Sequence, residues 1–223
     1  SHPHVSQNGK IAVVHNGIIE NYLEIREFLQ EKGVQFTSQT DSEVVAQLME
    51  YCMGLPEVST VSDALYMVLH RIEGAYALGI LCSDDPDHIY AARKDAPLLL
   101  GFGKGENFIA SDVTAIIKYT RNDAYMDDGE IAVLTADSID VFDDELVPVE
   151  KSRHQVDWDV TAAEKGGYPH FMFKEILEQP EAIRKTVSPR IRDGRVVLDD
   201  FSLTAEQVRD ISRIFIIACG SSY

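Results

Sequence analysis

The hydrophobic pattern of this chain changes its period at Gly74, and no other feature constrains the fold as strongly. Before Gly74, apolar residues recur mostly every three or four positions, which indicates helices. After it, short apolar runs are separated by Asp, Pro, Gly and Asn, which is typical of consecutive antiparallel strands. Because helices and strands come in blocks rather than in strict alternation, we expect an α+β fold of layered sheets and helices, and not a doubly wound parallel sheet.

The same pattern predicts the individual elements of the first part. Residues 11–15 read as a buried strand, and the helix that follows ends at Gly33. A second helix is predicted behind the tetrapeptide at residues 40–43, "TDSE", which fits a capping box, and a third over residues 61–72 with Gly74 as its end. The predicted strands beyond Gly74 are residues 75–83, 88–94, 96–103, 107–111, 130–136 and 138–143.

The composition becomes polar after residue 150, which indicates a domain boundary. "EKGG" and the following Pro169 disfavour both helix and strand, so we expect residues 1–150 to form one domain, 151–169 a linker and 170–223 the beginning of a second domain.

The second part is predicted to contain a helix that Pro180 interrupts or restarts, a short helix at residues 203–212 and a strand within 213–223. A single strand needs sheet partners, and this sequence contains none for it, so we expect a fragment that is cut at both ends.

Composition and charge exclude several functions. The 37 acidic and 20 basic side chains give a net charge of −17, which repels a nucleic-acid backbone. No apolar run approaches the ~20 residues that span a bilayer, and residues 1–15 do not have the layout of a signal peptide. The three cysteines, Cys52, Cys82 and Cys219, lack the spacing of a disulfide framework or a zinc site. We therefore expect a cytoplasmic protein without nucleic-acid or membrane partners.

The first candidate site is His15-Asn16-Gly17, where the buried strand is expected to end. Asn-Gly alone is typical of a turn, but here a helix follows rather than a second strand. At a strand-to-helix junction, the Asn16 side-chain amide and the Gly17 backbone N–H can converge on an oxyanion. The pattern assigns no role to His15.

Three further segments contain residues suited to binding. His2 and His4 alternate in an extended segment and can share a metal or line a site, although no third ligand is evident nearby. Asp41 offsets the helix dipole or accepts a cationic ligand such as an ammonium group. Ser221 and Ser222 follow a predicted strand, where hydroxyl groups and backbone N–H groups form either a phosphate cradle or a plain turn.

The segments "VVHNGIIENY", "TDSEV", "GENFIASD", "DDGEIAVL", "FMFKEILEQP" and "ACGSSY" occur in an order and spacing that resemble the glutamine–fructose-6-phosphate aminotransferase (isomerising) family, the glucosamine-6-phosphate synthases. The resemblance implies an αββα sandwich of the N-terminal-nucleophile amidotransferase type, incomplete here, followed by a linker and the first elements of an α/β sugar-isomerase domain. It also implies an enzyme with the substrates glutamine and fructose 6-phosphate, with no cofactor, that forms a homodimer.

The resemblance implies a role for each matching residue. Asn16 and Gly17 form the oxyanion hole, Asp41 binds the glutamine ammonium group, and His4 lines the same site. Ser221 and Ser222 contact the sugar phosphate substrate.

The family's nucleophilic cysteine and the arginine that holds the glutamine carboxylate lie upstream of Ser1, so the segment alone is expected to be inactive. Three alternatives stay open at this point. The chain is a segment of another N-terminal-nucleophile amidotransferase, such as the phosphoribosyl-pyrophosphate enzyme, or a non-catalytic glutamine-binding module. The third is a metal protein built on His2 and His4.

Overall fold

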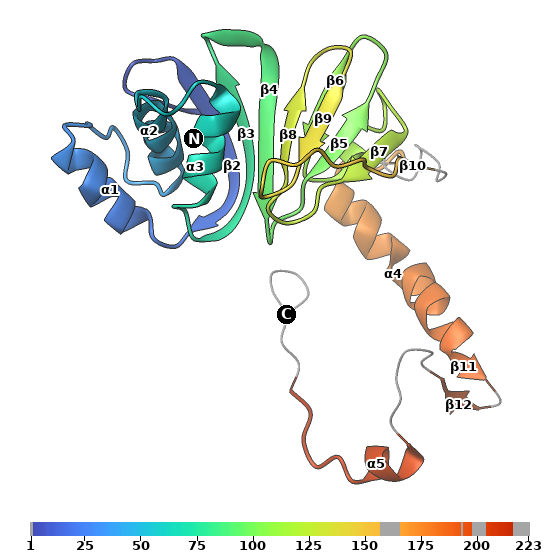
Figure 1. Cartoon of the computed structure of the whole chain (residues 1–223). Helices are drawn as coiled ribbons and strands as arrows, with labels where there is room; N and C mark the ends of the chain where they lie inside the picture. The colour runs from blue at the N-terminus through green and yellow to red at the C-terminus, as the bar shows by residue number, and fades with distance from the viewer. Residues whose placement is uncertain (1, 157–165, 193, 198–203, 216–223) are drawn as a thin grey trace. The chain divides into compact units, whose positions relative to one another are not determined.

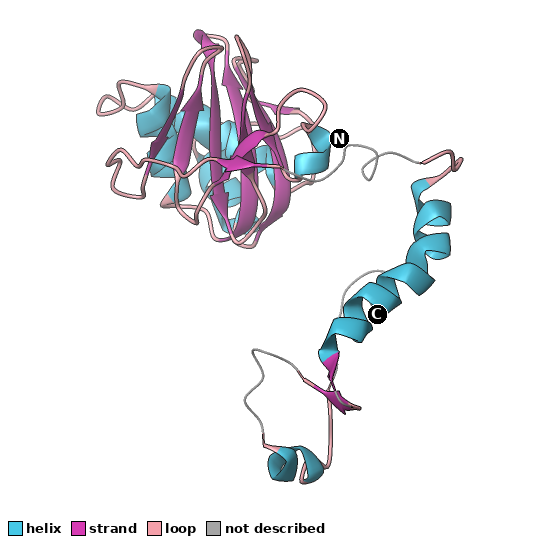
Figure 2. Ribbon diagram, turned by 90° about the vertical axis from the view of Figure 1, so that its right-hand side faces the viewer, coloured by secondary structure: helices cyan, strands magenta, loops and turns pink. Residues whose placement is uncertain are grey.

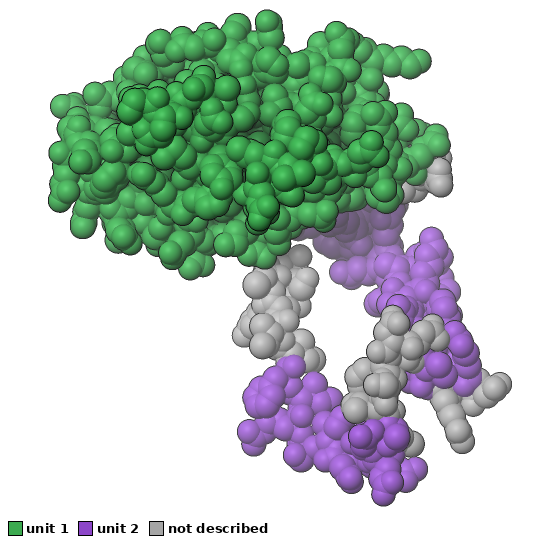
Figure 3. All heavy atoms as spheres, in the orientation of Figure 1, with its two compact units in different colours: residues 1–163 green, residues 164–223 purple. Residues whose placement is uncertain are grey.

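The computed structural model describes residues 2–156, 166–192, 194–197 and 204–215. The chain divides into two compact units, Ser1–Ala163 and Glu164–Tyr223, which Figure 3 colours green and purple. The predicted domain limits at residues 150 and 170 stay predictions.

Unit 1 contains two antiparallel sheets, which confirms the expected α+β class. The larger sheet has the order β1 (His4–Val5), β2 (Ile11–Ile19), β3 (Gly74–Cys82), β4 (Asp85–Lys94), β8 (Ile131–Leu134) and β9 (Ile139–Phe142) (Figure 1). The smaller sheet has the order β10 (His154–Gln155), β7 (Asn122–Tyr125), β5 (Leu99–Phe102) and β6 (Asn107–Ala110). All six predicted strand runs beyond Gly74 are present, whereas β1, β7 and β10 were not predicted.

Three helices, α1 (Tyr22–Glu31), α2 (Ser42–Met53) and α3 (Val61–Leu69), cover one face of the larger sheet (Figure 1 and Figure 2). Their apolar sides and the sheet form one core, in which side chains such as Leu48 and Ile80 are fully buried. Each such side chain contributes about 1.5–3 kcal/mol by its removal from water.

A second core lies between the two sheets. Leu100 and Met126 from the smaller sheet side and Ala91 and Leu134 from the larger sheet belong to it. The short 3-10 helix η1 (Val113–Ala115) connects β6 to the segment before β7. Unit 1 is therefore layered as helices, sheet and sheet in the part of the chain that the structure describes.

Two predictions about helix ends are wrong. The third helix ends at Leu69 rather than at residue 72, because Gly74 already starts β3. The predicted capping box at residues 40–43 does not form, since the Glu43 side chain is buried and bonds to the preceding loop, and Asp41 makes no side-chain cap bond. A capping box is found instead at the start of α3, between Thr60 and Asp63.

Unit 2 contains α4 (Phe171–Val187), the 3-10 helix η3 (Ser188–Arg190), the hairpin β11 (Ile191–Arg192) and β12 (Arg195–Val196), and α5 (Ala205–Arg209). The predicted break at Pro180 is wrong, because α4 continues through it. The helix is mostly exposed, so water can solvate the carbonyl group that loses its partner at the proline.

The predicted strand at 213–223 is described only for residues 213–215, which have no strand structure, and the rest lies outside the described residues. Within the described ranges, none of the helices combines the length and the apolar character that crossing a bilayer requires.

Candidate functional site

The His15-Asn16-Gly17 segment lies inside β2 and not at its end. His15 pairs with Leu78 and Gly17 with Tyr76, and the pairing with β3 continues to Ile19. The predicted strand end at His15 is therefore wrong, because cross-strand pairing with β3 overrides the turn preference of Asn-Gly.

Glycine is the only residue type that fits at position 17. Its φ of +134° lies in a region that L side chains rarely adopt, and a Cβ atom there would lie 2.1 Å from the carbonyl oxygen of Ala75. The backbone of β3 thus approaches β2 at a point where a side chain has no room.

The backbone N–H of Gly17 faces away from β3. At one end of the β2–β3 ladder the Ser83 N–H donates to the Lys10 carbonyl, and at the other the Glu20 N–H donates to the Glu73 carbonyl. Because bonded pairs alternate along an antiparallel ladder, the even-numbered residues of β2 bond to β3 and the odd-numbered ones face the other edge. On that edge β1 pairs with β2 only at residues 12 and 13, so the Gly17 N–H lies beyond the pairing of β1.

The Asn16 side chain lies on the face of β2 opposite to that of His15, because side chains alternate along a strand. Asn16 is exposed, and its amide group makes no hydrogen bond with any residue that the structure describes. The amide N–H groups are therefore available to a ligand.

Asp41 lies immediately before α2 and is bonded to the same edge of β2. Its Oδ2 accepts a hydrogen bond of 2.9 Å from the backbone N–H of Ile19, two residues after Gly17. Its other carboxylate oxygen has no hydrogen-bond partner among the described residues, and the side chain is partly exposed. An exposed carboxylate oxygen with open lone pairs suits a cationic ligand.

His15 is buried and contacts the first residue of α2. Its Nδ1 lies 2.8 Å from the Ser42 hydroxyl oxygen, while Nε2 is buried without a hydrogen bond of normal geometry. Burial lowers the pKa of His15, although Asp41 and the Ala75 backbone oppose this, so the ring is neutral near pH 7.

His4 lies beside the segment that carries Asp41. It stands opposite Val13 in β1, and its Nε2 is 3.4 Å from the Thr40 hydroxyl oxygen. Burial and the nearby His2 ring lower the pKa of His4. The described residues contain no group of three or more His, Cys, Asp or Glu side chains arranged to hold a metal, so the metal hypothesis for His2 and His4 gains no support.

Sequence reasoning missed the role of Glu43. This carboxylate is 1% exposed and accepts hydrogen bonds from the backbone N–H groups of Thr37 at 2.8 Å and Ser38 at 2.6 Å, and from both hydroxyl groups. Burial raises its pKa, but the bonds from Ser38 and Thr37 outweigh burial and lower it. An acid shortly behind a Ser- and Thr-rich loop was the available signal.

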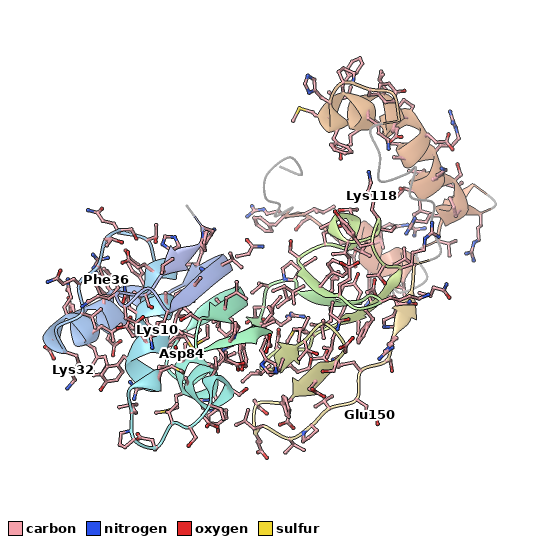
Figure 4. All side chains as sticks on the ribbon, turned by 90° about the horizontal axis from the view of Figure 1, so that it is seen from above. Lys10, Lys32, Phe36, Asp84, Lys118 and Glu150 are labelled. Atoms are coloured by element: carbon pink, nitrogen blue, oxygen red, sulfur yellow. The ribbon has the colours of Figure 1, made fainter. Side chains whose placement is uncertain are left out.

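The loop before α2 is also held from the side of α1. The guanidinium of Arg26 lies 4.5 Å from the centre of the Phe36 ring, which Figure 4 labels, and donates a 2.8 Å hydrogen bond to the Ser38 carbonyl. The loop that leads to Asp41 is therefore fixed by charged groups from both flanking helices.

The remaining candidate residues and the cysteines divide into two groups. Ser221, Ser222 and Cys219 lie outside the described residues. Cys52 and Cys82 are free thiols in the core between helices and sheet, 0% and 2% exposed, and burial raises the pKa of the Cys52 thiol. Neither thiol has the exposure that a nucleophile needs.

The candidate site is therefore Asn16, Gly17 and Asp41, with His4 beside the Asp41 segment, from β1, β2 and the start of α2, while His15 is buried and bonded to the neighbouring Ser42. The site offers two N–H donors and one carboxylate, which suit a ligand with a carbonyl or oxyanion and a cationic group.

Comparison with known proteins identifies similar sequences over the whole chain. The model of a glutamine amidotransferase domain family matches residues 1–118. Enzymes named glutamine–fructose-6-phosphate aminotransferase (isomerizing) are similar over the full length of this chain. The one from Caldanaerobacter subterraneus subsp. tengcongensis is 56% identical, that from Clostridium acetobutylicum 46% and that from Thermotoga maritima 40%. Each alignment covers 100% of this chain but 36% of the relative, so the chain spans about a third of their length. The resemblance stated from the sequence is confirmed.

Solved structures confirm the fold. Glutamine phosphoribosylpyrophosphate amidotransferase from B. subtilis, complexed with ADP and GMP, superposes with a TM-score of 0.53 at 22% identity and covers 65% of this chain and 31% of its own. An allosteric regulatory enzyme of purine biosynthesis gives a TM-score of 0.51 at 22% identity, over 64% of this chain and 30% of its own. At this identity the likeness concerns the fold alone.

Proposed function

The chain belongs to the glutamine amidotransferase domain family, and from this premise we propose that it is part of an enzyme that hydrolyses glutamine and passes the ammonia to fructose 6-phosphate. The products are glutamate and glucosamine 6-phosphate. One observation carries the proposal: the free Asn16 amide and the Gly17 N–H lie in the second half of β2, and the Asp41 carboxylate is bonded to the end of the same strand at Ile19. The names of the relatives support the choice of the acceptor sugar.

In this proposal the thiolate of a cysteine outside these 223 residues attacks the side-chain amide carbon of glutamine. The carbonyl oxygen becomes an oxyanion and accepts hydrogen bonds from the Asn16 side chain and the Gly17 N–H. The C–N bond breaks, the leaving nitrogen takes up the proton that the thiol gave up and departs as ammonia, and water then hydrolyses the thioester to glutamate and the free thiol. The Asp41 carboxylate holds the α-ammonium group of glutamine throughout, and His4 lines the site.

The proposal extends to the part of the chain after unit 1. Residues 1–150 form the domain that binds and hydrolyses glutamine, and residues 151–169 form the linker between the two domains. Residues 170–223 begin the sugar-isomerase domain, where Ser221 and Ser222 contact the sugar phosphate. The whole enzyme is a cytoplasmic homodimer that uses no cofactor. The buried free thiols Cys52 and Cys82 support a reducing compartment. Cell fractionation and light scattering of the intact protein test location and assembly.

The test of function is product formation by the intact polypeptide that contains this segment. We expect equal amounts of glutamate and glucosamine 6-phosphate from glutamine and fructose 6-phosphate. Glutamate release without the amino sugar would contradict the proposed acceptor. If phosphoribosyl pyrophosphate rather than fructose 6-phosphate accepts the ammonia, the result would instead support an amidotransferase of the phosphoribosyl-pyrophosphate type.

The isolated 223-residue segment is proposed to be inactive, since Cys52 and Cys82 are buried and the segment has no other cysteine within unit 1. Glutamate release by the purified segment would contradict this. Tight glutamine binding by the segment, measured by calorimetry, would favour the alternative of a non-catalytic glutamine-binding module.

A further inference from the structure

His15 has no role in the proposed chemistry, yet its side chain is buried, at 7% exposure. We infer that His15 is a positioning residue for Asp41. Its ring joins Ser42, the first residue of α2, to β2, so that the Asp41 carboxylate keeps a fixed place relative to Asn16 and Gly17. The inference rests on the proposed function, because it gives Asp41 the substrate ammonium group.

Two neighbouring residues at the start of α2 are bonded to one strand. The Asp41 carboxylate accepts from the Ile19 N–H at 2.9 Å, and the Ser42 hydroxyl lies 2.8 Å from His15 Nδ1. His15 precedes Asn16 and Gly17 in β2, and Ile19 follows them. The start of α2 is therefore bonded to β2 both before and after the two proposed oxyanion donors. The Ile19 N–H occupies Oδ2 of Asp41, which leaves the other carboxylate oxygen for the substrate ammonium group.

Burial makes the His15–Ser42 contact effective. Ser42 is 6% exposed, so water cannot replace the imidazole as its partner. The remaining polar contacts of this segment do not involve β2: Glu43 binds Thr37 and Ser38, and the Thr40 hydroxyl lies 3.4 Å from His4 of β1. Loss of the His15 contact therefore leaves Asp41 attached to β2 by the Ile19 bond alone.

The second ring nitrogen excludes a direct catalytic role. Nε2 is buried, so a substrate does not reach it in this structure, and it has no hydrogen-bond partner of normal geometry among the described residues. Burying an unpaired polar atom is unfavourable, and an apolar side chain would avoid that cost. The presence of histidine is explained if Nδ1 is required, and Ser42 is the partner of Nδ1.

The experiment compares variants of the intact polypeptide with glutamine and with 4-carbamoylbutanoate, which is glutamine without its α-ammonium group. His15→Gln moves the polar group away from the Nδ1 position, and His15→Asn keeps one there. We expect His15→Gln to lower kcat/KM for glutamine about tenfold, mainly through KM, the scale of one lost hydrogen bond. The same variant should lower hydrolysis of the analogue less than about twofold, and His15→Asn should retain activity with glutamine within about threefold.

Ser42→Ala should reproduce His15→Gln, and the double variant should lose no more than either single one. His70→Gln is the matched control, because it removes an exposed imidazole that bonds to the Tyr66 carbonyl at the end of α3. An equal loss with glutamine and with the analogue would overturn the inference, since it would indicate a general structural role.

A second measurement does not depend on catalysis. The Ile19 amide should exchange its hydrogen faster in His15→Gln and Ser42→Ala than in the wild type or His70→Gln, because its bond to Asp41 is weakened. Unchanged exchange would overturn the inference. A wild-type protein that does not hydrolyse glutamine would overturn the proposed function instead, and the exchange of Ile19 would still decide whether His15 positions Asp41.

Discussion

The two sides of the α2 N-terminus differ in how fully their polar groups are bonded. On the loop side, the Glu43 carboxylate accepts four hydrogen bonds from Thr37 and Ser38. On the β2 side, the Asn16 amide makes none with described residues, and Asp41 uses one oxygen. The difference is one of function: the loop side only supports α2, whereas the β2 side holds α2 through His15 and Ile19 and also keeps polar groups available for a ligand.

The β2 side is tested most strongly by Asn16→Ala. We expect glutamine turnover by the intact polypeptide to fall ~10²-fold or more, the usual effect of removing one oxyanion donor. Steady-state glutamate release measures it. Asn122→Ala, an exposed asparagine in β7 of the other sheet, is the matched control and should leave turnover unchanged. A loss below about threefold in Asn16→Ala would contradict the oxyanion role.

The loop side is tested by Glu43→Gln. This change replaces a charged acceptor by an amide whose NH₂ group faces N–H donors. We therefore expect the free energy of unfolding at pH 7 to fall by about 2–3 kcal/mol. Urea unfolding of the intact polypeptide measures the change. Glu24→Gln, on the exposed part of α1, is the control and should have little effect.

The pH dependence of the same variant sharpens this test. The folded-state pKa of Glu43 lies below its ordinary value of 4.5, so its contribution is present above about pH 4.5 and is lost as the pH falls through the folded-state pKa. The wild type and Glu43→Gln should therefore converge in stability in acid. A difference that stays constant from pH 7 to well below 4.5 would contradict the hydrogen-bonded carboxylate.

Asp41→Asn tests the partly bonded carboxylate on the β2 side. The ammonium contact exists in the ground state and the transition state alike, so the main effect should be a KM for glutamine about tenfold higher or more. Steady-state kinetics separate KM from kcat. A fall confined to kcat would be evidence against the proposed contact.

The smallest effect is expected away from both sides. Lys10 and Asp84, labelled in Figure 4, form a 2.8 Å ion pair whose side chains are 50% and 53% exposed. Exposed pairs contribute little, so Lys10→Ala should leave the urea midpoint and glutamine turnover unchanged within error. A large loss of turnover would contradict the independence of this exposed pair from the proposed site.

The sequence predicted elements better than contacts. In unit 1, the change of period at Gly74 correctly separated helices α1 to α3 from the strands that follow, because it depends on which residues face the core. The end of β2 was missed, since continued pairing with β3 depends on Ala75 and Tyr76, which are far away in the sequence. The contact of His15 with Ser42 was missed for a similar reason, because a hydrogen bond between two layers has no periodic signal. The contacts of Glu43 with Thr37 and Ser38 are local and were missed because bonds to a loop leave no hydrophobic period.

The two buried thiols can report when the core between the helices and the larger sheet opens. Cys52 lies in α2 and Cys82 at the end of β3, and both are almost inaccessible to solvent. A short pulse of an alkylating reagent should modify each of them only after the surrounding layer has separated. Peptide mapping after such pulses at rising urea would reveal whether the helix that follows Asp41 detaches before the sheet opens.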